Sequence, residues 1–241
     1  MRSYWDLLLF FTCYSFLGWM METIFASINE RKFINRGFLT GFFCPLYGFG
    51  AVLAVLSSKW ASTVFENNNI TSLVISILLA IILVTVLEYL TGFILEKIFN
   101  CKWWDYNSNF ANIHGYICLK YSLLWGLLAL LLLQVVHPVI SELVFAMPGS
   151  IKGYIAALLC LYFLVDTAKS IIDALDLRKV ILNYTNLPVN KYYEKILRYK
   201  RFFLAFPRLL ILNAGIINRD VRSILDDRFD KIKVKVKSKF Q

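Results

Sequence analysis

ITSLVISILLAIILVTVLEYLTGFIL, residues 70–95, decides the class of fold to which this chain belongs. Glu88 is the single charged residue in this stretch. An α-helix rises about 1.5 Å per residue, so roughly 20 apolar residues cross the hydrocarbon core of a bilayer. A helix that is apolar on every face has to be surrounded by protein or by lipid. The stretch therefore predicts a membrane-spanning helix.

The whole chain of 241 residues has a membrane composition, with 59% hydrophobic residues, 17% charged residues and a mean hydropathy of +0.61. Soluble domains carry about a quarter charged residues, so we exclude a soluble globular domain. We predict an all-α, polytopic helical membrane protein with about five transmembrane helices, at residues 4–28, 38–57, 70–95, 117–136 and 151–174. The second stretch predicts a kinked or partly re-entrant segment, because it contains Gly41, Pro45, Gly48 and Gly50.

Charge divides the chain into two regions, a transmembrane domain over residues 1–174 and a basic, helical cytoplasmic region over residues 175–241. The second region holds 16 Lys and Arg against 6 Asp and Glu, whereas the first holds 10 of each. Residues 191–206 mix basic and apolar side chains, as in helices that lie on a membrane surface. Lysine alternates with other residues from 231 to 239. We expect anionic lipid headgroups as the partner of this region, with a protein as the second interpretation, and no nucleic acid.

The distribution of Lys and Arg predicts the orientation, because these residues concentrate in cytoplasmic loops. The loops after the first and third predicted helices are basic, as is the C-terminal region, and the opposite side holds only Arg2, Lys59 and Lys152. We therefore predict a multi-pass protein with its N-terminus outside and its C-terminus in the cytoplasm. The first helix lacks the basic start and cleavage site of a signal peptide, so we expect it to be retained.

Ionisable side chains at membrane depth cost roughly 2.5–3.5 kcal/mol each and therefore face protein or water. Glu22, Glu88 and Asp166 would all lie about 9–12 Å inside the cytoplasmic boundary. The sequence predicts a polar cavity formed by five residues: Glu22, Arg36, Glu88, Asp166 and Lys169. Such a cavity would hold a cationic group, relay protons or bind a headgroup. The alternative is a set of interhelical ion pairs that only orders the bundle.

Four motifs exceed what a generic membrane helix needs: YSFLGW (14–19); NRGFL (35–39) with CPLYG (44–48); LEYLTG (87–92) with WWDY (103–106); and NIHGYICL (112–119). Together and in this order they resemble the CmpB family, the type IV ABC-transporter permeases of bacteria. The resemblance covers about residues 14–138 and departs from the family at Phe42, where Pro is frequent, and at Tyr116, where Arg is frequent. It implies a protein that moves a substrate across the bacterial cytoplasmic membrane.

The motifs supply further candidate contacts: Trp19, Asn35, Tyr47, Trp104 and Asp105. Each motif also has a structural interpretation. Glycines spaced four apart allow close helix packing, and aromatic residues anchor helices at the membrane interface. The loop around Asp105 either docks onto a partner ATPase or anchors the helix end.

We expect a permease-like transporter subunit of unknown substrate, working as an oligomer or with a separate ATPase, because the sequence contains no Walker A motif. An enzyme is the less favoured class. It would act on a lipid or lipid-linked substrate, with Glu22 and Glu88 as acid and base. A scaffold or regulator with a lipid-binding tail is the third hypothesis. We expect no cofactor and no metal, since the five cysteines and two histidines lack ligand spacing.

Overall fold

The computed structural model describes residues 4–182, 198–206 and 209–211, and the described part is almost entirely helical. The helices are α1 (Tyr4–Glu30), α2 (Pro45–Val64), α3 (Asn69–Phe99), α4 (Leu119–Leu131), the π-helical turn η1 (Leu132–Val136), α5 (His137–Ala146), α6 (Gly149–Leu182) and α8 (Lys200–Ala205). In the described part of the chain they are accompanied by four two-residue strands: β1 (Cys101–Lys102), β2 (Asn112–Ile113), β3 (Ile117–Cys118) and β4 (Leu210–Ile211). The predicted all-α class is confirmed.

Within the described residues, four helices are long and apolar enough to cross a membrane: Tyr4–Glu30, Asn69–Phe99, Leu119–Ala146 and Gly149–Lys179. The predicted class of helical membrane protein is confirmed, but the described residues contain four such helices where about five were predicted. The helix that falls short is α2, which carries Ser57, Ser58 and Lys59 in its second half.

The predicted boundary of the second span was wrong, since residues 38–44 are not helical and α2 begins at Pro45. A proline is well suited to the first position of a helix and restricts the residue before it to extended backbone. Cys44 has that extended conformation, with φ −119° and ψ 93°. The irregular stretch is tolerated because neighbouring helices supply its hydrogen bonds, as described below.

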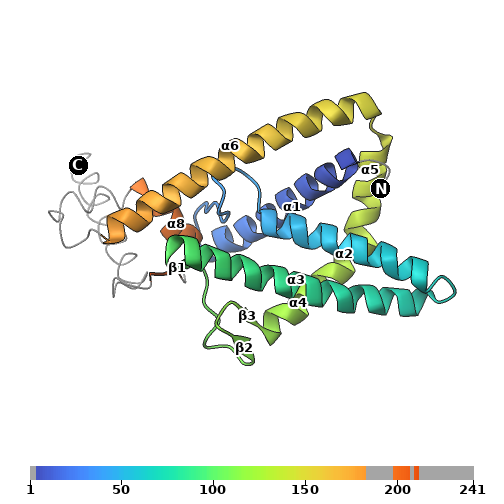
Figure 1. The fold of residues 1–241 in the computed structure, drawn as a ribbon, viewed down its shortest axis with the longest axis horizontal. Helices are drawn as coiled ribbons and strands as arrows, with labels where there is room; N and C mark the ends of the chain where they lie inside the picture. Colours follow the sequence, from blue (N-terminus) through green and yellow to red (C-terminus); the bar gives the residue numbers. More distant parts are fainter. Residues whose placement is uncertain (1–3, 183–197, 207–208, 212–241) are drawn as a thin grey trace, which may run out of the picture.

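The helices run back and forth along one bundle (Figure 1). α2 packs against both α1 and α3, and α4 packs on α3. α3 buries one residue in every four, namely Ser72, Ser76, Ala80, Val84, Glu88 and Gly92. These are mostly small, which lets the helices approach closely. The remaining faces of α3 stay apolar and exposed, as expected for a lipid-facing surface.

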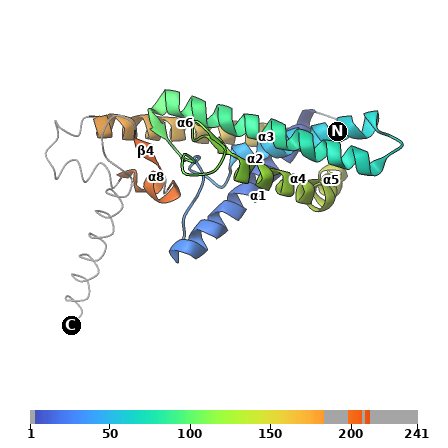
Figure 2. The ribbon, with the colours of Figure 1, turned by 90° about the horizontal axis from the view of Figure 1, so that it is seen from below.

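α1, α3 and α6 all end at the same end of the bundle (Figure 1), which the predicted orientation assigns to the cytoplasm. The last turns of α1 lean away from the other helices (Figure 2), so that Ile24, Phe25 and Ile28 are exposed. At the opposite end, α5 turns away from α4 after the π-helical turn. Pro138 lies at this bend, and its missing N–H removes a helical hydrogen bond. The predicted span 117–136 therefore continues to Ala146.

Part of the C-terminal region folds back onto the bundle. β4 pairs antiparallel with β1, Cys101 opposite Ile211 and Lys102 opposite Leu210. Phe202 and Phe203 of α8 are buried in a cluster with Phe99 and Trp103. α6 passes through Ala174 without a break. Of the expected surface helix 191–206, residues up to 197 lie outside the described residues, as does the whole lysine-rich stretch 231–239.

Candidate functional site

The first half of the site joins α1 to the start of α2. Glu22 of α1 accepts a hydrogen bond from the Tyr47 hydroxyl, with 2.6 Å between the oxygen atoms. Its other carboxylate oxygen lies 3.6 Å from Nε of Arg36. Gly18 precedes Glu22 by about one turn, and a Cβ at Gly18 would overlap the Tyr47 ring. The absence of a side chain at Gly18 therefore lets Tyr47 reach Glu22.

The second half surrounds Glu88, which belongs to the buried stripe of α3 and is 3% exposed. Trp125 of α4 donates its indole N–H to Oε2 of Glu88 over 2.9 Å. Tyr106, in the segment between β1 and β2, donates its hydroxyl to Oε1 over 3.4 Å. Burial, followed by the neighbouring Glu88 carboxylate, raises the pKa of Tyr106 above its usual range, so this donor keeps its proton. Within the described residues, no Lys or Arg pairs with Glu88.

The two halves meet through aromatic rings. The rings of Tyr47 and Trp125 are in edge contact, with centroids 5.2 Å apart. Tyr47 donates to Glu22 and Trp125 donates to Glu88, so the pair bridges the two carboxylates. The structure thus brings together three of the five predicted cavity residues, Glu22, Arg36 and Glu88. This cluster holds two acids and one base, and we call it the acidic cluster.

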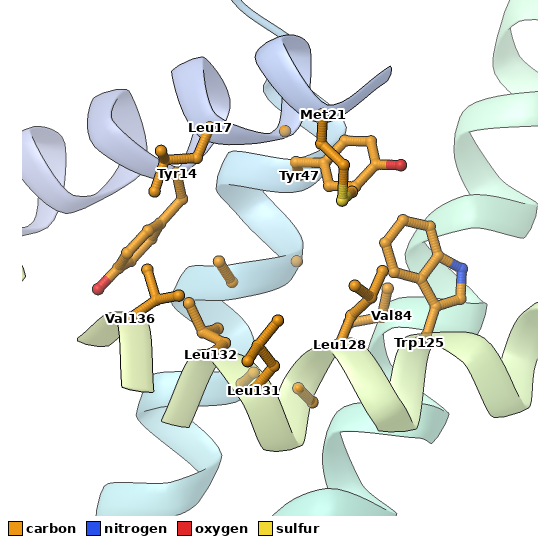
Figure 3. Close-up of a pocket in the computed structure, with 15 residues that line it drawn as sticks. Tyr14, Leu17, Met21, Tyr47, Val84, Trp125, Leu128, Leu131, Leu132 and Val136 are labelled. Atoms are coloured by element: carbon orange, nitrogen blue, oxygen red, sulfur yellow. The ribbon is translucent and has the colours of Figure 1, made fainter. Parts of the chain in front are cut away.

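A cavity of about 140 Å³ lies beside the acidic cluster, between α1, α2, α3, α4 and η1. Its walls are apolar, formed by residues such as Leu17, Val84 and Leu132. Tyr47 and Trp125 close one end (Figure 3), with the hydroxyl and the indole nitrogen on the far side of each ring. The cavity therefore meets the faces and edges of the two rings, while the polar atoms of those rings contact the carboxylates.

Asp166, the fourth predicted residue, holds the irregular stretch before α2. Its two carboxylate oxygens accept the backbone N–H groups of Thr40 and Gly41, over 3.0 and 2.9 Å. From the other side, Asn35 donates to the Thr40 carbonyl over 2.8 Å and accepts the indole N–H of Trp19, also over 2.8 Å. Asp166, Asn35 and Trp19 are therefore positioning residues for this loop. Lys169, the fifth predicted residue, is exposed on α6.

Arg201 of α8 binds the same loop, and nothing in the sequence distinguishes it from the other basic residues of the C-terminal region. Its guanidinium donates to three consecutive carbonyls, those of Gly37, Phe38 and Leu39, over 3.1, 3.0 and 2.6 Å. A planar group with five N–H donors suits such a set of acceptors. Arg36, which directly precedes these three residues, forms the ion pair with Glu22.

Trp104 and Asp105, the remaining motif candidates, order the segment that carries Tyr106. Trp104 donates its indole N–H to the Tyr116 carbonyl over 2.8 Å. Asp105 accepts the backbone N–H of Asn107 over 3.2 Å and lies 4.0 Å from Nζ of Lys102. The importance of Tyr106 and Trp125 was missed, although both fall within or beside the quoted motifs.

The opposite end of the bundle holds a buried ion pair that was also missed. Asp6 is 0% exposed, and Nζ of Lys152 lies 2.8 Å from its carboxylate. The sequence places Lys152 on the outer side of the membrane, because it follows the start of the predicted span 151–174 by one residue, but it does not indicate Asp6 as its partner. The described residues contain no group of three or more His, Cys, Asp or Glu side chains suited to a metal ion.

Apolar helices that can cross a membrane, with acidic side chains gathered between them, define a polytopic membrane protein. Residues 9–171 match the model of the family described as "Putative ABC-transporter type IV", and the chain belongs to this family. The family that the motifs indicated is thereby confirmed. The match includes Glu22, Glu88 and Asp166 and stops before Arg201. No curated protein and no solved structure matches the chain.

Proposed function

We propose that this chain is the membrane subunit of a transporter, and that the acidic cluster borders the path of its substrate. The observation that carries the proposal is the setting of Glu88. This carboxylate is 3% exposed, receives hydrogen bonds from two neutral donors and lies beside a cavity. Burying a charged group without an opposite charge is costly, and intramembrane acids of this kind mark substrate and ion pathways.

The Asp6–Lys152 pair provides the comparison within the same protein. It has the geometry of an ion pair that only orders a bundle, since each charge contacts an opposite charge directly at 2.8 Å. Glu88 lacks such a partner among the described residues, and Glu22 shares a longer contact of 3.6 Å with Arg36. The contrast favours a substrate path over purely structural ion pairing for the acidic cluster.

We propose that this subunit works with a separate ATPase in the cytoplasmic membrane. The sequence has no Walker A motif, so ATP hydrolysis would come from a separate subunit. The exposed apolar end of α1 would be covered by lipid or by another copy of the chain, since few helices enclose little on their own. We place the protein in the bacterial cytoplasmic membrane, with the N-terminus outside, the C-terminus inside and the basic tail near anionic headgroups.

The test replaces the natural copy of the gene in its own cells, so that any partner subunit is present. Short-term uptake and release of a mixed pool of labelled solutes is measured by mass spectrometry. The cells compared lack the gene, or carry the Glu88→Gln or the Glu142→Gln variant in its place. Glu142 is exposed on α5 and provides the matched control. We expect the deletion and Glu88→Gln to change the flux of the same solute, and Glu142→Gln to leave it unchanged.

Membrane insertion is checked in parallel by quantifying each variant in the membrane fraction. Normal flux in inserted Glu88→Gln would contradict the proposal. A deletion that alters lipid or lipid-linked compounds, with every solute flux unchanged, would contradict it as well and would point to the enzyme hypothesis.

A further inference from the structure

We infer that the cavity binds an organic cation that carries an apolar body of about the size of a benzene ring. This inference deepens the proposed function by naming the substrate class. Binding of the cation would depend on the cavity and on the two rings that close it, whereas its transport rests on the proposed function.

The size and lining of the cavity define the apolar part of the ligand. Its volume is about 140 Å³, and its walls carry few polar atoms. Cavities of about 150 Å³ lined by aliphatic and aromatic side chains admit benzene. Small residues such as Ala51 and Gly50 leave this space open, because larger side chains there would fill it.

The closed end of the cavity defines the charge of the ligand. Tyr47 and Trp125 present their rings to the cavity (Figure 3). Their hydroxyl and N–H groups donate to Glu22 and Glu88. Aromatic rings attract cations within about 6 Å of the ring centroid, and Trp is the strongest of them. A ring that donates a hydrogen bond to a carboxylate is more negative still, because the carboxylate polarises it. An ammonium group at this end would therefore be favoured.

The balance of charge supports the same conclusion. The acidic cluster has two carboxylates against one guanidinium, and that guanidinium is 3.6 Å from Glu22 rather than near Glu88. A single positive charge on the ligand would balance the cluster. Without a ligand cation, a buried carboxylate that has no opposite charge is neutralised by a proton, so the cation would take the place of that proton, whereas an anion would be repelled.

The first test uses the full chain in lipid nanodiscs and needs no variant. Binding of three probes is measured by titration calorimetry, with empty nanodiscs subtracted. The probes are benzyltrimethylammonium; neopentylbenzene, in which a carbon atom replaces the nitrogen; and tetramethylammonium, which lacks the ring. We expect benzyltrimethylammonium to bind at least about tenfold more tightly than either of the others. Equal binding of neopentylbenzene would overturn the charge requirement, and equal binding of tetramethylammonium would overturn the role of the cavity.

The second test locates the site with paired variants. Ala51→Leu fills the cavity and Glu88→Gln removes one charge, and both are expected to weaken benzyltrimethylammonium binding about tenfold or more. Ala157→Leu and Glu142→Gln make the same chemical changes at exposed positions and should bind like the unaltered chain. Unchanged binding by Ala51→Leu would place the ligand elsewhere and overturn the inference.

The two proposals fail separately. A chain that binds none of the probes, but whose Glu88→Gln variant loses solute flux, contradicts the ligand class and leaves the transporter proposal standing. A chain that binds benzyltrimethylammonium at this site, but whose Glu88→Gln variant has normal flux, contradicts the transporter proposal and leaves the binding site standing.

Discussion

Replacing Asp166 by Asn tests whether this acid positions the loop before α2 instead of contacting a substrate. In the native chain its two carboxylate oxygens accept two backbone N–H groups, at 3.0 Å from Thr40 and 2.9 Å from Gly41. An Asn side chain has a single carbonyl oxygen, so one N–H would face an amide NH₂ group. The substitution therefore removes one hydrogen bond outright and takes the negative charge from the other.

The size of the effect follows from those contacts. A hydrogen bond to a charged group contributes about 1.5–3 kcal/mol, so the loss of one such bond and the weakening of the other are both counted here. The Thr40 N–H keeps a second acceptor, Oγ of Ser170 at 3.1 Å. Since Asp166 is 7% exposed, little of this is regained from water. We expect opening of the loop to become easier by about 3 kcal/mol, which corresponds to roughly a 100-fold change in an equilibrium constant. The rest of the bundle should stay folded, because the effect is confined to a loop that Asn35 and Arg201 still hold.

Hydrogen–deuterium exchange in nanodiscs measures this directly, by mass spectrometry of peptides that cover residues 36–44. Asp166→Asn should speed exchange in these peptides by about two orders of magnitude. Asp176→Asn provides the matched control, because Asp176 lies on the same helix in an exposed pair with Lys179. Exchange that changes less than about threefold in Asp166→Asn, or equally in both variants, would refute the positioning role.

Two further predictions concern the contacts on either side of this loop. Arg201→Gln should loosen α8 and speed maleimide labelling of Cys101 about tenfold at neutral pH, as read by peptide mass spectrometry. Burial raises the pKa of the Cys101 thiol to about 11, so its exposure should make it more reactive. Unchanged labelling would contradict the binding of the loop by Arg201. Gly18→Ala should destabilise the chain by about 1–3 kcal/mol in thermal unfolding, because its Cβ overlaps Tyr47, whereas Gly153→Ala, with open space around it, should be neutral or stabilising.

The transmembrane helices were predictable because their signal is local. A run such as residues 70–95 is apolar on all faces, and the bilayer imposes a minimum length on it. The second span was misplaced for an equally local reason. Hydropathy counts Phe38, Phe42 and Phe43 as spanning residues. The helix α2, however, begins only at Pro45, so these residues lie in irregular backbone. Side chains distant in sequence, those of Asp166 and Arg201, help to hold that backbone, and hydropathy does not report them.

The candidate site was predictable in part. Glu22, Arg36 and Glu88 could be grouped because a charge within a span has a definite depth, and depth follows from counting residues. Counting fixes the level of a side chain but leaves its direction around the helix open. Asp166 lies at a similar level yet faces the loop, and Lys169 is exposed. Neutral partners such as Tyr106 and Trp125 carry no charge signal, so only the fold reveals them.

The contacts of Arg201 change how the C-terminal region should be understood. The family match ends at residue 171, and by sequence the region beyond it is an appendage. In the structure, a guanidinium from this appendage binds the carbonyls of residues 37–39, and the residue before them, Arg36, pairs with Glu22. A change that moves α8 therefore acts on the support of Arg36, and through it on the charge balance of the acidic cluster. It follows that substitutions in the tail have to be tested for loop exchange before any effect on flux is assigned to lipid or partner binding.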